Sequence, residues 1–168
     1  MAAAEARERV VDALMASGLT WTVLRPTGVF NDMEALFEMA RRGVFYVIGD
    51  GTARINPIHG ADVAEQVVRC IGDPQAHNQA MGIGGPDVLT TRQIGELAFE
   101  ALGRPPKIRS IPPWLLGVAS FLLSPFNANA AALLRALQVV SMMDMTGTPC
   151  GEHRLRDFFL ELASTRSS

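Results

Sequence analysis

The sequence has little that would direct it to a metal ion, a disulfide framework or a nucleic acid. Its two cysteines, Cys70 and Cys150, form no CxxC pair and no cluster with the three histidines. Two free cytosolic thiols are therefore expected, and neither a zinc site nor a disulfide. The formal net charge is −2, and no stretch concentrates Lys and Arg. A nucleic-acid partner is not expected, because such proteins neutralise phosphates with clustered basic residues.

Features of an exported or membrane-spanning protein are also lacking. The stretch MAAAEARERVVDAL carries charges where a signal peptide needs an apolar core, so a cytoplasmic protein is predicted. A long stretch without any charge lies between Arg109 and Arg135. Its apolar run from Trp114 to Leu123 is too short for a transmembrane helix, which needs roughly 20 residues. We expect a buried helix pair here, with an apolar substrate pocket or peripheral membrane contact as alternatives.

Helical and extended patterns alternate along the chain, which is typical of an α/β protein. Apolar residues at helical spacing predict helices over 4–17, 31–43, 61–71, 90–102 and 152–163. Asn31 with Glu34, and Thr90 with Gln93, have the spacing of capping boxes at the starts of two of these helices. The inner face of the last helix is expected to consist of Leu155, Phe158, Phe159 and Leu162. Short apolar or β-branched runs predict two parallel core strands and one edge strand, at 20–24, 80–84 and 107–111. The turn Gly49-Asp50-Gly51-Thr52 predicts an antiparallel hairpin between 45–48 and 53–55. Two core strands are few for a doubly wound sheet, which usually holds about five or more.

Two loops carry residues that could form a binding site. Pro26-Thr27-Gly28-Val29-Phe30 follows the first strand, and ligands of open parallel sheets gather where the strands end. Pro26 stiffens this loop, and Gly28 would allow a ligand ring to approach the backbone closely. The second loop, Asn56-Pro57-Ile58-His59, precedes a helix whose first turn contains Asp62. Here the alternative to a binding role is that His59 caps the helix and that Asp62 favours its positive end.

Three long segments resemble the atypical short-chain dehydrogenase/reductases, including the branch of divinyl chlorophyllide reductase-like proteins. The segments are ERVVDALMASGLTWTVLRPTGVFNDM, GDGTARINPIHGADVAEQVV and GIGGPDVLTTRQIGELAFEALGRPPKIRSIPPW, and GEHRLRDFF is similar to the closing helix of some members. They span most of residues 5–115 and keep the order of the family's motifs. The resemblance implies a Rossmann-like α/β fold, an NAD(P) cofactor, a small-molecule substrate and oxidoreductase chemistry.

The resemblance also assigns residues. It implies that Pro26, Thr27, Gly28, Val29 and Phe30 lie beside the nicotinamide, and we assign Asn56, Pro57, His59 and Trp114 to the substrate pocket. Many relatives use a Tyr-x-x-x-Lys pair, but the corresponding positions hold Ala3 and Arg7, so the catalytic residues are unknown.

The family's glycine-rich phosphate-binding turn has no counterpart in this sequence, which contains no GxGxxG. The chain is thus expected to correspond to a C-terminal half that binds NAD(P) weakly by itself. It is expected to form a homo-oligomer or to require an N-terminal half. We predict a partial Rossmann-like domain with a hairpin insertion over 1–111, and a helical, substrate-side segment over 112–168. The alternative function is a non-catalytic accessory or interaction domain that docks through residues 110–134.

Overall fold

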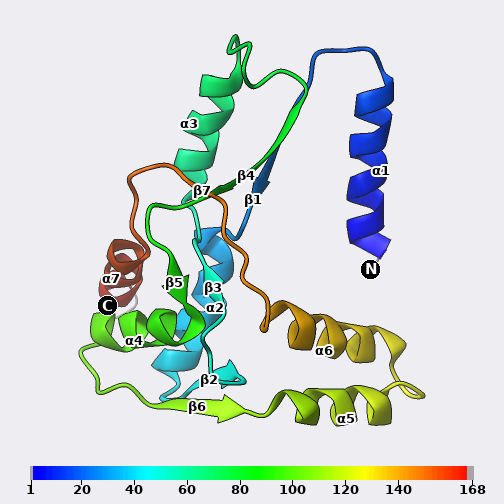
Figure 1. The fold of residues 1–168 in the computed structure, drawn as a ribbon. Helices are drawn as coiled ribbons and strands as arrows, with labels where there is room; N and C mark the ends of the chain where they lie inside the picture. Colours follow the sequence, from blue (N-terminus) through cyan, green and yellow to red (C-terminus); the bar gives the residue numbers. More distant parts are fainter. Residues whose placement is uncertain (1, 166–168) are drawn as a thin grey trace.

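The computed structural model describes residues 2–165, with side-chain surroundings from residue 5 onward. Helices and strands alternate along most of this range (Figure 1). The helices are α1 (Ala2–Ala16), α2 (Phe30–Arg41), α3 (Gly60–Cys70), α4 (Thr91–Ala101), α5 (Pro113–Leu123), α6 (Ala128–Val140) and α7 (Leu155–Thr165). The strands are β1 (Thr22–Pro26), β2 (Phe45–Ile48), β3 (Arg54–Ile55), β4 (Gln79–Gly84), β5 (Leu89–Thr90), β6 (Ile108–Ile111) and β7 (Thr148–Pro149).

The largest sheet of the described residues has three parallel strands in the order β1-β4-β7. Thr22 lies opposite Gln79 at the start of the β1–β4 pairing, and Ile83 lies opposite Thr148 where β7 joins. The three strands end at the same edge of the sheet, so the loops that follow them lie close together. The α/β fold class and the parallel pairing of the two predicted core strands are confirmed.

The predicted hairpin between 45–48 and 53–55 is wrong, although both of its strands exist. β2 pairs in parallel with β6, whereas β3 pairs antiparallel with β5. The turn between them does place Gly49 and Gly51 at positive φ, 68° and 73°. Phe45 of β2 is fully buried in the core, and this burial holds β2 where β6 is its neighbour. Turn chemistry alone does not decide which strand a neighbouring segment joins.

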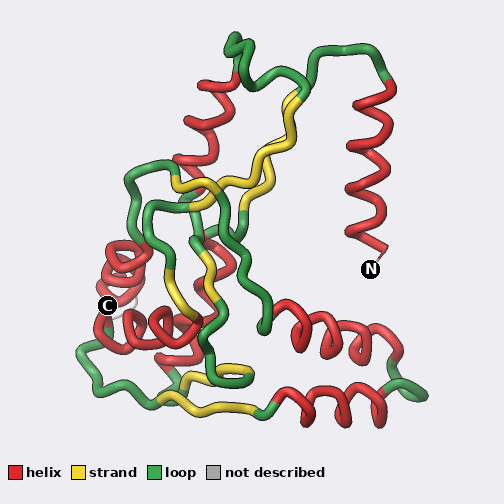
Figure 2. The backbone as a smooth tube through the Cα atoms, in the orientation of Figure 1, coloured by secondary structure: helices red, strands yellow, loops and turns green. Residues whose placement is uncertain are grey.

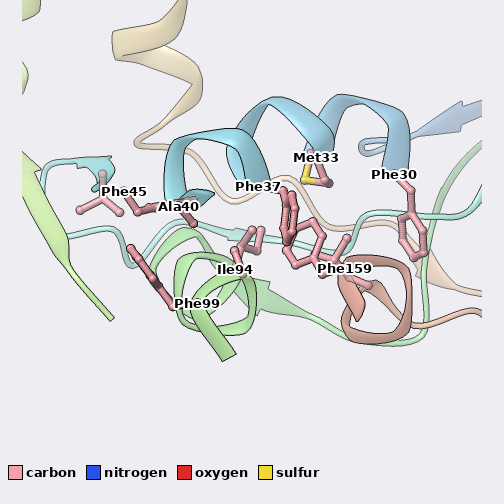
Figure 3. Packing of buried hydrophobic residues seen from close by; sticks show 11 residues of the cluster. Phe30, Met33, Phe37, Ala40, Phe45, Ile94, Phe99 and Phe159 are labelled. Carbon is pink, nitrogen blue, oxygen red and sulfur yellow. The ribbon is translucent and has the colours of Figure 1, made fainter. Parts of the chain in front are cut away.

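The hydrophobic core lies where α2, α4 and α7 meet (Figure 3). The ring centroids of Phe37 and Phe159 are 5.3 Å apart, and both side chains are fully buried. Burying each such side chain stabilises the fold by about 1.5–3 kcal/mol. Leu155 is also buried, so the predicted inner face of the last helix is confirmed.

The starts of α2 and α4 differ in how well the sequence predicted them. The Thr90 and Gln93 side chains form the expected capping box of α4. α2, by contrast, begins at Phe30 after Val29, which makes no side-chain cap, so the predicted cap at Asn31 is wrong. A parallel bridge between Val29 and Ile58 keeps the chain extended up to this point, and the helix starts where that bridge ends.

Two parts of the chain project from the core, as Figures 1 and 2 show. α1 is linked to β1 by the Glu8–Arg25 ion pair, with N···O distances of 2.9 and 3.0 Å. α5 and α6 pack against each other, and Ser120 Oγ donates to the Ala131 carbonyl at 2.9 Å. The predicted burial of this pair is wrong, since many of its apolar side chains are exposed and Phe126 is 87% exposed.

The segment beyond residue 112 contributes to both parts of the structure. β7 extends the main sheet and α7 completes the core, whereas α5 and α6 stand apart. The division of the chain at residue 111 stays a prediction. Among residues 2–165, no helix is long and apolar enough to cross a membrane.

Candidate functional site

A cavity of about 620 Å³ lies beside the edge at which the parallel strands end. Phe30 reaches it from the start of α2, and Glu152 and His153 reach it from the segment after β7. The remaining lining residues are His59, Arg154, Asp157, Phe158, Leu160, Glu161 and Ser164. This edge is where open α/β sheets bind their ligands.

Three rings from different segments meet on one wall of this cavity. His59 is stacked on His153, with ring centroids 4.4 Å apart and an interplanar angle of 26°. Phe30 meets His59 edge to face at 5.4 Å. His59 Nδ1 also accepts a hydrogen bond from the Ala61 N–H at 3.3 Å, so the predicted cap of the helix is present.

His153 is held from behind by a buried carboxylate. Its Nδ1 lies 2.7 Å from Asp62 Oδ1, and its backbone N–H donates to Asp62 Oδ2 at 3.2 Å. The Asp62 side chain is 3% exposed, whereas that of His153 is 53% exposed. A β-carbon at Gly151 would lie 2.2 Å from Asp62 Cγ, so the carboxylate packs directly on that backbone. The glycine is also required by its φ of +81°.

The environment of Asp62 fixes the protonation of this pair. Burial raises the pKa of Asp62, but hydrogen bonds from the His153 ring, the His153 N–H and the Glu152 N–H outweigh it, so the pKa lies below its usual value. The ionised carboxylate accepts a hydrogen bond from Nδ1–H, which leaves Nε2 of His153 available to a ligand. Because the imidazole is half exposed beside the cavity, this nitrogen can exchange a proton with a bound molecule.

The loop after β1 is clamped between β4 and residues 56–58. The Thr27 N–H donates to the Ile83 carbonyl at 3.0 Å, and Thr27 Oγ1 donates to the Asn56 carbonyl at 2.8 Å. The Ile58 N–H donates to the Gly28 carbonyl at 2.8 Å. Of the five predicted cofactor contacts, Phe30 lines the cavity, whereas Pro26 lines a second hollow of about 550 Å³ between β1 and α3.

The small size of Gly28 has a different cause from the one expected. A β-carbon at this position would lie 3.0 Å from Ile55 Cδ1 and 3.9 Å from the Met33 methyl group. Its φ is not in the left-handed region. The missing side chain therefore makes room for Ile55. The side chain of Ile55, and not a ligand, occupies the space beside Gly28 on this side.

Asn56 is fully buried and joins four segments of the chain. Its amide nitrogen donates to the carbonyls of Gly85 and Gly147, each at 3.1 Å. Its amide oxygen accepts from the Gly147 N–H at 2.9 Å and from Thr27 Oγ1 at 3.2 Å. Both polar ends of the side chain are thus engaged within the protein.

The predicted pocket residues are not all brought together. His59 lines the large cavity, Asn56 and Pro57 are buried behind it, and Trp114 is on the projecting α5. The sequence did not indicate His153 and Asp62 as a pair, because they are separated by 91 positions. The segment GEHRLRDFF was the available signal, and it predicted only a helix.

One further potentially reactive group, the Cys150 thiol, lies near the site. Burial and the charge of Asp62 raise the pKa of Cys150, so its thiol is less prone to ionise than a free cysteine. Within the described residues, no group of three or more His, Cys, Asp or Glu side chains is placed to hold a metal ion.

Comparison with known proteins shows which proteins this chain is similar to. No protein-family model matches the chain. The chain is 34% identical over 119 residues to the chloroplastic divinyl chlorophyllide a 8-vinyl-reductase of Cucumis sativus. The aligned region covers 67% of this chain and 28% of the reductase. It is 26% identical over 117 residues to the mitochondrial NADH dehydrogenase (ubiquinone) 1 alpha subcomplex subunit 9 of Arabidopsis thaliana. This alignment covers 66% of this chain and 28% of that subunit.

Solved structures show the same fold. The crystal structure of isoflavone reductase superposes with a TM-score of 0.72 at 15% identity, covering 94% of this chain and 57% of that chain. An NADPH-dependent quinone oxidoreductase from Escherichia coli in complex with NADPH superposes with a TM-score of 0.62 at 19% identity, with the same coverage. The chain spans 28% of the length of the curated relatives described above, and 57% of these solved chains.

These observations define the class of protein first. The parallel sheet, with a cavity at the ends of its strands, has the Rossmann-like α/β fold of NAD(P)-binding reductases. The sequence matches then identify the family: the chain belongs to the atypical short-chain dehydrogenase/reductases.

Proposed function

We propose that this chain supplies the nicotinamide-side loop and the substrate pocket of an NAD(P)-dependent oxidoreductase. The observation that carries the proposal is the cavity at the ends of the parallel strands, where Phe30 and His59 meet His153. Support also comes from the relatives, since one is a reductase by name and one structural neighbour holds NADPH.

The residues present fit one end of the cofactor. The aromatic wall and the loop 26–30 suit a flat nicotinamide ring beside the sheet edge. The pyrophosphate would need a glycine-rich turn at a helix N-terminus, and the sequence contains no GxGxxG. We therefore place that turn in a separate N-terminal half. The position of β1 at the edge of the described sheet leaves room for further strands.

Each residue of the ring cluster has a role in this proposal. NAD(P)H, when bound, supplies a hydride to an electrophilic atom of a small-molecule substrate. In its imidazolium form, with a proton on each ring nitrogen, His153 donates the Nε2 proton to the adjacent substrate atom and is left as the neutral ring, whose Nδ1–H Asp62 holds. This assignment fits the absence of the Tyr-x-x-x-Lys pair, because Tyr46 lies in β2, outside the lining of the cavity.

The first test measures cofactor affinity. The chain alone should bind NADH and NADPH with dissociation constants near or above about 1 mM, since pyrophosphate contacts provide most of the affinity. Fusion to the N-terminal half of a related reductase should tighten binding by at least an order of magnitude. Calorimetric titration decides: tight binding by the chain alone contradicts the missing phosphate site, and no gain on fusion contradicts the cofactor function.

The second test uses the fused protein and a substrate accepted by the donor reductase. His153→Asn keeps a donor near the position of Nδ1, so the contact with Asp62 and the melting temperature should be retained. Turnover should fall by about 10²–10⁴-fold, the usual contribution of general acid–base catalysis, with cofactor affinity unchanged. His77→Asn, at an exposed histidine, is the control. Unchanged turnover in His153→Asn would assign the proton to another group.

The second candidate function is a non-catalytic accessory domain that docks through residues 110–134. The exposed apolar helices favour it, as does the similarity to a subunit of the mitochondrial NADH dehydrogenase. A fused protein that binds no cofactor, together with a stable complex purified through residues 110–134, would support this function instead. Self-association and a cytoplasmic location also remain proposals, which light scattering and cell fractionation test.

A further inference from the structure

α5 has two apolar sides, and only one of them is covered. Gly117 and Ser120 face α6: a β-carbon at Gly117 would lie 3.5 Å from Gln138 Oε1, and Ser120 is fully buried. Helical geometry puts a second row of residues on the opposite side. This row, here called the outer face, is Trp114, Leu115, Val118, Phe121 and Leu122, which are between 46% and 73% exposed.

The outer face continues beyond the end of the helix. Phe126, in the turn between α5 and α6, is 87% exposed. Contiguous exposed apolar surface of this extent is uncommon in proteins that work in water alone, and it marks an interaction site.

The charged residues that flank the outer face along the sequence are all basic. Between Glu100 and Asp144 the sequence contains no acidic residue, and its charged residues are Arg104, Lys107, Arg109 and Arg135. Lys107 and Arg109 are exposed and directly precede α5, and β6 runs in line with α5 along one edge of the molecule (Figure 1). The Arg135 side chain is held between the helices, with Nε donating to Ser120 Oγ at 2.9 Å.

We propose that the outer face of α5, with Phe126, lies in the interfacial layer of an anionic lipid bilayer. A helix of 11 residues is about 16 Å long, too short to span but long enough to lie in the plane of the interface. Its apolar side chains enter the boundary between headgroups and acyl chains, and Lys107 and Arg109 meet the lipid phosphates. Trp114 lies at the basic end of the helix, and an indole ring favours the headgroup level.

The charge pattern favours lipid over a second copy of the chain. In a two-fold symmetric dimer the same patch meets itself, and residues 101–143, which form this patch, contain no carboxylate to receive Lys107 or Arg109. An anionic bilayer satisfies both the apolar and the basic part of the surface. The inference does not depend on the proposed oxidoreductase function, since it concerns a different part of the chain.

Vesicle flotation with the full chain tests this inference. Vesicles of phosphatidylcholine with about 30% phosphatidylserine should carry the chain upward, whereas pure phosphatidylcholine should bind it at least about tenfold more weakly, because each basic residue near the surface contributes roughly fivefold. Phe121→Ser with Leu122→Ser should abolish flotation. The matched control is Val68→Ser with Ile71→Ser, two exposed apolar residues at the end of α3, which should bind as the unmodified chain does.

A second measurement follows the protein itself. In Trp21→Phe the remaining tryptophan is Trp114, so its emission should shift to the blue on anionic vesicles and be quenched by brominated lipid. Lys107→Gln with Arg109→Gln should weaken binding to anionic vesicles and leave melting unchanged. Absence of flotation, equal binding to both vesicle types, or no effect of the outer-face substitutions would overturn the proposal. Dimerisation in solution that the Phe121/Leu122 substitutions abolish would assign the face to a second copy instead.

Discussion

Replacing Asn56 by alanine should destabilise the fold far more than an ordinary substitution of a polar residue. Asn56 is fully buried, and its side chain makes four hydrogen bonds to Thr27, Gly85 and Gly147. The Asn56 side chain occupies a space that is free because residue 84 is glycine. A β-carbon at position 84 would lie 2.2 Å from Asn56 Cγ. The side chain therefore joins β1, β4 and the segment before β7 at the edge of the sheet.

The size of the effect follows from the groups left behind. Alanine would leave the Gly147 N–H and the Gly85 and Gly147 carbonyls without their partner, and it would open a cavity. Each buried polar group left unsatisfied costs about 1–3 kcal/mol, partly relieved by water or local movement. We expect a loss of roughly 3–5 kcal/mol, a large share of the 5–15 kcal/mol that stabilises a typical domain.

Urea unfolding followed by circular dichroism measures this loss, provided that the slope m is unchanged. Asn56→Asp is a more specific test, because it keeps the shape of the side chain but replaces the amide NH₂ group by an oxygen that faces two carbonyl oxygens. This variant should lose at least as much unfolding free energy as Asn56→Ala. Asn129→Ala, at an exposed position in α6, should change stability by less than about 0.5 kcal/mol. A loss below about 1 kcal/mol for Asn56→Ala would show that these hydrogen bonds do not hold the sheet edge together.

Two further predictions concern Asp62 and Gly28. Because the pKa of Asp62 is lowered from its usual 3.8, its ionised form stabilises the fold above about pH 4, and this contribution is lost as the pH falls through the lowered pKa. Asp62→Asn should thus be less stable at neutral pH and show a flatter decline below about pH 4 in acid unfolding; an unchanged acid limb would contradict the pairing. Gly28→Val should cost about 1–3 kcal/mol by overpacking against Ile55, and the cost should shrink in an Ile55→Ala background. Weaker cofactor binding in the fused protein with unchanged stability would instead restore a ligand-contact role for Gly28.

Local patterns predicted most of the regular elements well. The capping box at Thr90, the helix over 61–71 and the inner face of α7 depend on residues within a few positions of one another. The parallel pairing of β1 with β4 also followed, because a helix between two strands leaves few other arrangements. The partner of β2 did not follow, since the residues of β6 that pair with it lie 63 positions further along the chain, and burial of Phe45 holds β2 beside them.

The candidate site was predictable in part, where it depends on local sequence patterns. The loops that contribute Phe30 and His59 carry family motifs and follow a strand or precede a helix, so their place at the sheet edge could be expected. His153 and Asp62 could not be paired, because no spacing rule connects residues on separate segments. The reason for Gly28 also required coordinates, since Ile55 fills the space beside it.

The amino-acid sequence by itself determined the family, the alternation of helices and strands, and the strongly apolar, acid-free stretch before Asp144, because these are properties of order and composition. Only the tertiary structure decided which strands pair, that Asn56 is sealed inside, and that His153 is held by Asp62 beside a cavity. It also decided that α5 keeps one apolar face uncovered. These features depend on which distant segments burial brings into contact, and no local pattern encodes that choice.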